Sequence, residues 1–329
     1  MTSRARPVVL VLLVVICLVL ADQIARMVGI PRAGGLLCLA NLATLVIAIK
    51  LGWQRALVAV GSLALLTVPT VLSQGNPPAA TLLLMLTALA LGLSARRQLL
   101  PVYWLMVVSL CLLITNSPLP ATASPAELAR LVMAVLASGG LSTALHTLVL
   151  ARHDAPIHPL ALPVAHSWRR CLAYGVLLAT TTAITTPIAL AHHWHTNGLW
   201  LILTPFLVLK PFVRDAWRVA LHRSLGTMAG VALVLALAPA LPPTLPLQVP
   251  AIALAAITAA IAARHGHPAL MITAFTATIV LFNSNAADLP LMADKRLQAC
   301  ALGIAITLSV MAVAHPVEQR FQASHAEAA

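Results

Sequence analysis

Long apolar runs follow one another along almost the whole chain, separated by short stretches rich in Lys, Arg, Pro, Gly or Asn. About 20 helical residues are needed to cross a hydrocarbon layer about 30 Å thick. The runs predict about twelve transmembrane helices, near residues 7–28, 33–50, 54–73, 78–95, 100–115, 126–150, 168–191, 198–213, 219–241, 247–263, 268–285 and 294–315. The alternating pattern of a membrane β-barrel is absent, so we expect an all-α integral membrane protein.

Composition supports this class. Hydrophobic residues make up 60% of the 329 positions and the mean hydropathy is +0.96, which is more apolar than a soluble core and a solvated surface allow. The net charge is +12, but the basic residues lie one to four at a time between apolar runs and only 4% of residues are aromatic. This pattern is typical of orientation in a lipid bilayer and argues against nucleic-acid binding. The five cysteines are widely spaced and the histidine clusters lack companion acids, so we expect no metal and no other cofactor.

The distribution of charge between loops predicts that both termini are cytoplasmic. With that orientation, 15 of the 20 Lys and Arg residues fall on the inner side and 5 on the outer side. The first run also looks like a signal peptide with a cut after Ala21. Because everything downstream is also membrane-embedded, we expect an uncleaved first helix.

Two halves of the chain resemble each other. Residues 115–130 and 282–296 both begin with Asn-Ser at the end of an apolar run and close on an acid followed by Arg. Trp53 and Trp217 occupy corresponding inner loops. The sequence therefore predicts two parallel six-helix repeats, a pattern found in transporters. The expected divisions are a first membrane half at 1–150, a cytoplasmic connector at 151–166, a second membrane half at 167–316 and a cytoplasmic tail at 317–329.

One stretch, residues 207–230, concentrates charge. Lys210, Arg214, Arg218 and Arg223 lie within fourteen positions. They either mark the cytoplasmic side or, with Trp217, form a cationic inner vestibule that would concentrate an anionic substrate. Further along this stretch, the small residues Gly226, Thr227 and Gly230 predict a close helix crossing.

The order of residues in this region resembles the fusaric acid resistance and aromatic acid exporter superfamily. The positions that carry the resemblance are Trp200, Leu203, Thr204, Pro211, Trp217, Arg218, Ala220, Arg223, Gly226, Thr227 and Gly230. Arg130 and Arg296 match an arginine near the start of the sixth helix of each half, on the outer side. The resemblance covers about 167–316, is weak in the first half, and is that of a short, DUF2955-like member without the large cytosolic domain.

The resemblance implies a permease of the bacterial inner membrane that exports small aromatic carboxylic acids or related toxic compounds. It also implies a periplasmic membrane-fusion adaptor as a partner, and it leaves open whether the chain forms a homo-oligomer. The other expected partners are a small organic anion as substrate and the lipid bilayer, and no nucleic acid is expected.

Polar groups at membrane depth are the remaining candidates. Asp22 and Arg26 are four residues apart in the first run. They either form a structural ion pair, or the Asp22 carboxylate couples transport to the proton gradient. Four threonines precede Pro187, namely Thr181, Thr182, Thr185 and Thr186. Their hydroxyls either bond to carbonyls freed by the proline or line a substrate path.

Two other function classes compete with transport. A non-transporting membrane subunit would scaffold the periplasmic adaptor. A membrane enzyme would need a converging nucleophile, base and acid, which the sequence does not display, so we expect no enzyme activity. No nucleotide-binding motif is present, which favours a proton gradient as the energy source.

Overall fold

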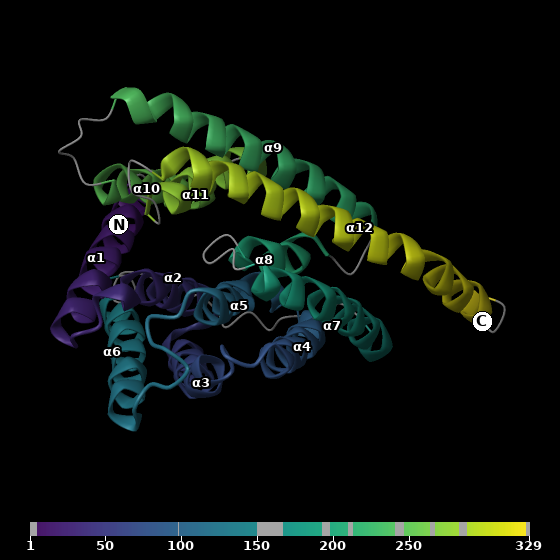
Figure 1. Cartoon of the computed structure of the whole chain (residues 1–329), viewed down its shortest axis with the longest axis horizontal. Helices are drawn as coiled ribbons and strands as arrows, with labels where there is room; N and C mark the ends of the chain where they lie inside the picture. Colours follow the sequence, from purple (N-terminus) through teal and green to yellow (C-terminus); the bar gives the residue numbers. More distant parts are fainter. Residues whose placement is uncertain are drawn as a thin grey trace.

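The computed structural model is a bundle of α-helices (Figure 1). It describes residues 5–97, 99–149, 167–192, 198–209, 213–240, 247–263, 267–282 and 288–326. The expected connector at 151–166 and Lys210 lie outside the described residues.

Six helices precede the connector and six follow it. The first six are α1 (Ala5–Met27), α2 (Gly34–Leu51), α3 (Trp53–Leu72), α4 (Pro77–Ser94), α5 (Leu100–Thr115) and α6 (Pro125–Val149). The second six are α7 (Trp168–Ala191), α8 (Gly198–Val208), α9 (Val213–Leu237), α10 (Gln248–Ala263), α11 (Pro268–Phe282) and α12 (Leu289–Ala326). The ranges described above contain no strand, which confirms the all-α class.

Most helices begin and end within a few residues of the expected runs, and three differ more. Helix α8 ends at Val208, five residues before the expected limit at 213. Helix α9 begins at Val213, six residues before the apolar run at 219, because Arg, Ala and Trp after the start tolerate a helix outside the apolar layer. Helix α12 continues to Ala326 and so includes most of the segment expected as a tail. Figure 1 shows this end of α12 projecting from the bundle.

Local sequence explains where several helices begin. The Ser124 Oγ atom accepts a hydrogen bond from the Glu127 backbone N–H at 3.3 Å, and the Glu127 carboxylate accepts one from the Ser124 N–H at 2.8 Å. This reciprocal pair is a capping box that starts α6, with Pro125 in the first turn. Gly52 alone separates α2 from α3, with a φ of 88° that side-chain-bearing residues rarely adopt.

Seven helical segments of the described chain are long and apolar enough to cross a membrane. They lie in α2, α3, α4, α6, α7, α9 and α12. Shorter apolar helices occur in α5, α8, α10 and α11. Helix α8 has 11 residues, which is about 17 Å at 1.5 Å per residue. The chain is thus a multi-pass membrane protein, while twelve complete crossings stay a prediction.

The two sets of six helices share several packing pairs. In the first set α1 packs on α2 and α6, α2 on α3 and α6, α3 on α5 and α6, and α4 on α5. In the second set these pairs recur, with α7 on α8 and α12, α8 on α9 and α12, α9 on α11 and α12, and α10 on α11. Helix α2 also packs extensively on α5, and the described residues of α8 and α11 make no comparable contact, so the two sets match in part.

Two of the contacts between the sets are reciprocal. Helix α4 packs on α7, and α10 packs on α1, so the fourth helix of each set meets the first helix of the other. Gly92 and Gly175 make the α4–α7 approach close, since a Cβ atom added at Gly92 would overlap the backbone of Gly175. A third contact, α5 on α8, has no comparable counterpart between the described residues of α11 and α2.

Candidate functional site

The residues predicted to form the cationic vestibule do not all face the same way. Arg214 lies in the first turn of α9, and its side chain is outside the described part of the structure. Trp217 is 61% exposed and Arg218 is exposed as well. Arg223 is only 5% exposed. Five residues turn a helix by about 140° beyond one full rotation, so Arg218 points outward while Arg223 points into the bundle.

Small residues bring α9 close to α11. A Cβ atom added at Gly226 would lie 2.8 Å from the Cβ of Ile272, and one added at Gly230 would lie 2.6 Å from the backbone oxygen of Thr273 and 2.8 Å from the Cβ of Thr276. Thr227, between the two glycines, is buried. Only glycine leaves room for this approach, and the approach sets where Thr276 lies relative to α9.

Arg296 enters the same region from α12. It is 2% exposed, and its Nη2 atom donates a long hydrogen bond of 3.4 Å to the Thr276 hydroxyl on α11. A second glycine crossing holds α12 against α8, because a Cβ atom added at Gly303 would lie 2.8 Å from the Cβ of Thr204. The two close crossings, α9 with α11 and α12 with α8, therefore fix the helices that surround the Arg296 guanidinium.

The indole of Trp200, on α8, is the centre of the cluster. The Cζ atom of Arg296 lies 3.1 Å from the centroid of the Trp200 ring, and the Cζ atom of Arg223 lies 5.8 Å from it. Phe275 meets the same indole edge to face at a centroid distance of 6.3 Å. Trp200 is 1% exposed. Cation–π contacts thus hold two guanidinium groups against one buried aromatic ring.

Cys300 completes the surroundings of the two arginines. It lies one helical turn after Arg296 on α12, is 3% exposed and sits beside both guanidinium groups. We call Trp200, Arg223, Thr276, Arg296 and Cys300 the arginine pair site.

The arginine pair site is positively charged and incompletely hydrogen-bonded. Within the described residues, no acidic side chain pairs with Arg223 or Arg296. The Nε and Nη2 atoms of Arg223 and the Nε and Nη1 atoms of Arg296 are buried without a hydrogen-bond partner. Burying a charge costs several kcal/mol unless an opposite charge accompanies it. The arrangement is therefore suited to binding an anion.

This grouping differs from the expected placement of the arginines. The sequence assigned Arg223 to an inner vestibule and Arg296 to the outer side, yet both meet at Trp200. Helices α9 and α12 pack side by side, and long arginine side chains can bridge the remaining distance along the helix axes. Arg130, which was paired with Arg296 as its repeat counterpart, is instead exposed beside Gly29. It lines a small cavity of about 200 Å³ together with Arg32 and Glu127.

The four predicted threonines of α7 are fully buried. The Thr181 and Thr182 hydroxyls donate to the carbonyls of Leu177 and Leu178 at 2.7 Å, each one turn earlier in the same helix. The Thr185 hydroxyl donates to the Thr182 carbonyl at 3.5 Å, and the Thr186 hydroxyl has no hydrogen-bond partner. Pro187 has no N–H to bond the carbonyl of the residue four positions earlier, Ala183. The three threonine hydroxyls bond to carbonyls that precede Ala183 in the helix and not to that carbonyl.

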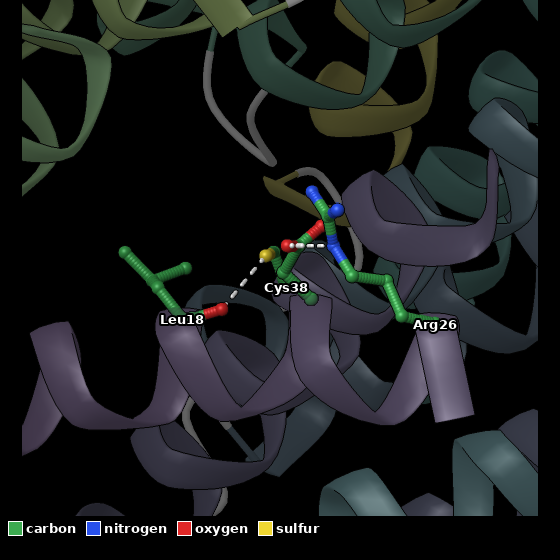
Figure 2. A network of polar contacts seen from close by, with 4 residues as sticks. Leu18, Arg26 and Cys38 are labelled. Carbon is green, nitrogen blue, oxygen red and sulfur yellow. Dashed lines mark hydrogen bonds and ion pairs between the residues drawn. The ribbon is translucent and has the colours of Figure 1, made fainter. Parts of the chain in front are cut away.

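Asp22 and Arg26 form an ion pair near the end of α1, with 2.8 Å between the Asp22 Oδ2 and Arg26 Nε atoms (Figure 2). Their side chains are 36% and 66% exposed, respectively. Close by, the Cys38 thiol of α2 donates to the Leu18 carbonyl at 3.5 Å (Figure 2). This pair belongs to the α1–α2 packing and lies apart from the residues around Trp200.

Sequence reasoning assigned no role to Thr276, Phe275 or Cys300, and it used Trp200 only as a mark of resemblance. One signal was available for part of this set, because Arg296 and Cys300 are four residues apart and so share a helix face. No sequence signal places Trp200 and Thr276 beside them, since these contacts join different helices.

Comparison with known proteins gives one match. Residues 172–310 match the family model described as fusaric acid resistance protein-like. This range contains Trp200, Arg223, Thr276, Arg296 and Cys300. No curated protein and no solved structure showed significant similarity to the chain.

Proposed function

The second half of the chain makes it a member of the fusaric acid resistance protein-like family, and from this premise we propose a transport function. The protein is an inner-membrane efflux permease that exports small organic acids, chiefly aromatic carboxylic acids or related toxic compounds. It performs no covalent chemistry on them. The family match and the apolar helices support a membrane transporter, and the remaining steps rest on the arginine pair site.

The observation that carries the proposal is the buried pair Arg223 and Arg296. Two guanidinium groups occupy the interior of a membrane bundle, and four of their nitrogen atoms lack hydrogen-bond partners. A carboxylate is the matching ligand, since guanidinium and carboxylate groups form parallel charge-assisted hydrogen bonds. The aromatic side chains of Trp200 and Phe275 offer the adjoining surface for an apolar or aromatic body.

Positively charged residues near the predicted cytoplasmic end of α9 would attract the anionic substrate towards the arginine pair site. Lys210, Arg214 and Arg218 precede Arg223 in the chain, and Arg218 and Trp217 are exposed. A row of positive charges raises the local concentration of anions at a membrane surface. We place this end in the cytoplasm because 15 of the 20 basic residues then fall inside, with both termini.

The two parallel repeats belong to the same proposal. They are supported by the helix pairs that recur in α1–α6 and α7–α12 and by the reciprocal contacts α4–α7 and α10–α1. An arrangement of this kind allows one half to move against the other during transport. A periplasmic adaptor at the outer ends of the helices would pass the exported acid onward.

We assign energy coupling to the proton gradient and test Asp22 as the coupling carboxylate. Its side chain is partly exposed and paired with Arg26. Asp22→Asn should lower efflux driven by a pH gradient while leaving exchange of labelled for unlabelled acid intact. Full gradient-driven efflux by this variant would remove Asp22 from the coupling scheme.

Efflux of benzoate from proteoliposomes tests the function. We expect wild-type protein to move benzoate, and Arg296→Gln to reduce transport at low concentration by about 10- to 100-fold, because a charge-assisted hydrogen bond contributes about 1.5–3 kcal/mol. Arg55→Gln is the matched control, since Arg55 is exposed at the start of α3. Absence of flux in wild-type protein, with an adaptor co-purifying, would favour the scaffolding subunit instead.

A further inference from the structure

The net charge of the arginine pair site limits which anions suit it. Arg223 and Arg296 together carry two positive charges, and within the described residues no acid neutralises either one. A ligand with one negative charge would leave one buried positive charge uncompensated. A ligand with two negative charges would compensate both, and the residual cost of burying charge in an apolar bundle would be smallest.

The unpaired nitrogen atoms are divided between the two guanidinium groups. Nε and Nη2 of Arg223 lie on one edge of its guanidinium, the edge that a carboxylate bridges with two parallel hydrogen bonds. Arg296 retains Nε and Nη1, while its Nη2 is bonded to Thr276. Arg223 can therefore hold an acid group through two parallel hydrogen bonds, whereas the free Nε and Nη1 of Arg296 lie on different edges and hold an acid group through single hydrogen bonds.

The two arginines are close enough to act on one small molecule. Both Cζ atoms lie near one ring centroid, at 5.8 Å and 3.1 Å. Their separation is therefore no more than about 9 Å, a range over which charges in a protein still interact by about 2 kcal/mol or more. A compact ligand with two neighbouring acid groups fits that range.

Cys300 is the remaining titratable group beside the arginines. Removing its sulfur therefore tests whether the thiol takes part in the selectivity.

We propose that the arginine pair site selects organic anions that carry two adjacent acid groups over anions that carry one. The proposal rests on the permease function and refines its substrate class. In it, Arg223 and Arg296 each bind one acid group, and Trp200 and Phe275 contact the apolar body that joins them.

Competition between benzoate and phthalate tests this selectivity, because phthalate adds a second carboxylate beside the first on the same ring. In proteoliposomes that exchange labelled benzoate at neutral pH, we expect phthalate to inhibit at a concentration at least about tenfold lower than unlabelled benzoate, equivalent to about 1.4 kcal/mol. Arg223→Gln should abolish or reverse that ratio, because one guanidinium remains. Arg55→Gln should keep it, since Arg55 is exposed at the start of α3.

Several results would overturn the proposal. Equal inhibition by both acids in wild-type protein would contradict it, as would an unchanged ratio in Arg223→Gln. Loss of the ratio in Cys300→Ala would assign the selectivity to the thiol. If Arg223→Gln transports too little for kinetics, the shift in melting temperature caused by each acid gives the same ratio. Flux of both acids without preference defeats only this inference, whereas flux of neither defeats the permease function.

Discussion

Replacing Arg296 by Met should make the protein more stable while removing its response to organic acids. Arg296 is 2% exposed and has no acidic partner among the described residues. Met has a similar length, no charge and a flexible apolar side chain that adapts to irregular space. The substitution therefore removes a buried charge without opening a large cavity.

The magnitude follows from the contacts of Arg296. The substitution loses the contact with the Trp200 ring, which is equivalent to about 0.5–2 kcal/mol, and a long hydrogen bond to Thr276 that contributes about 1 kcal/mol or less. It relieves repulsion from Arg223, at least about 2 kcal/mol for two charges within about 9 Å at an effective dielectric constant of 20. It also removes the desolvation cost of one buried ion, which is several kcal/mol.

The balance is a gain of about 1–4 kcal/mol in the free energy of unfolding, which raises the melting temperature by about 2–10 °C. Thermal unfolding of purified protein in detergent measures it. Arg130→Met is the control, because Arg130 is exposed and its loss should leave the melting temperature unchanged. Wild-type protein should be stabilised by phthalate, and Arg296→Met should not. A melting temperature at or below that of wild type would refute the view that Arg296 is buried at a net cost.

Two further predictions concern helix contacts. Gly230→Ala should lower the free energy of unfolding by about 1–3 kcal/mol relative to Gly140→Ala. A Cβ atom added at Gly230 meets the Thr273 backbone, whereas one added at Gly140 meets nothing within 4 Å. Equal melting temperatures of the two variants would contradict the close α9–α11 crossing. Thr186→Val should stabilise the protein by about 1 kcal/mol or more, because it removes a buried hydroxyl without a hydrogen-bond partner. Thr182→Val should not stabilise it, since the Thr182 hydroxyl is hydrogen-bonded. A higher melting temperature for Thr182→Val than for Thr186→Val would count against this assignment.

The positions of the helices could be predicted from the sequence because the length of an apolar run is a local property. The expected start of α7 at residue 168 and of α11 at residue 268 agree with the structure. The limits of α9 and α12 differ because helix propensity, and not hydropathy, decides where a helix ends outside the apolar layer. Hydropathy also does not report that α8 is too short to cross the layer alone.

The meeting of Arg223 and Arg296 was not predictable in the same way, because it depends on which face each helix turns to its neighbours. The comparison of Arg130 with Arg296 illustrates the difficulty. Their positions differ by 166, whereas Gly139 and Gly303 differ by 164. Both glycines accept a hydrogen bond from a threonine four residues later, at 2.9 Å and 2.6 Å, and both occupy a close crossing.

If the glycines are the equivalent positions, the two arginines are out of register by two residues. Two residues rotate a side chain by about 200° around a helix. Arg130 then points away from the bundle where Arg296 points into it, as their exposure shows. Similar loop sequences aligned the arginines, but the packing aligns the glycines.

If the glycines are taken as equivalent positions, this register indicates that the fold does not require buried charge. In the first half, the positions equivalent to Trp200, Arg223 and Arg296 are Leu36, Ala59 and Val132, all apolar and either buried or partly buried. The first half nevertheless shares with the second half the helix pairs around these positions, with α3 on α6 as α9 on α12 and α2 on α6 as α8 on α12. Two buried guanidinium groups without an acidic partner among the described residues therefore add a cost that the architecture can avoid. An anion bound from outside the chain would offset that cost, which is the physical reason to place the substrate between Arg223 and Arg296.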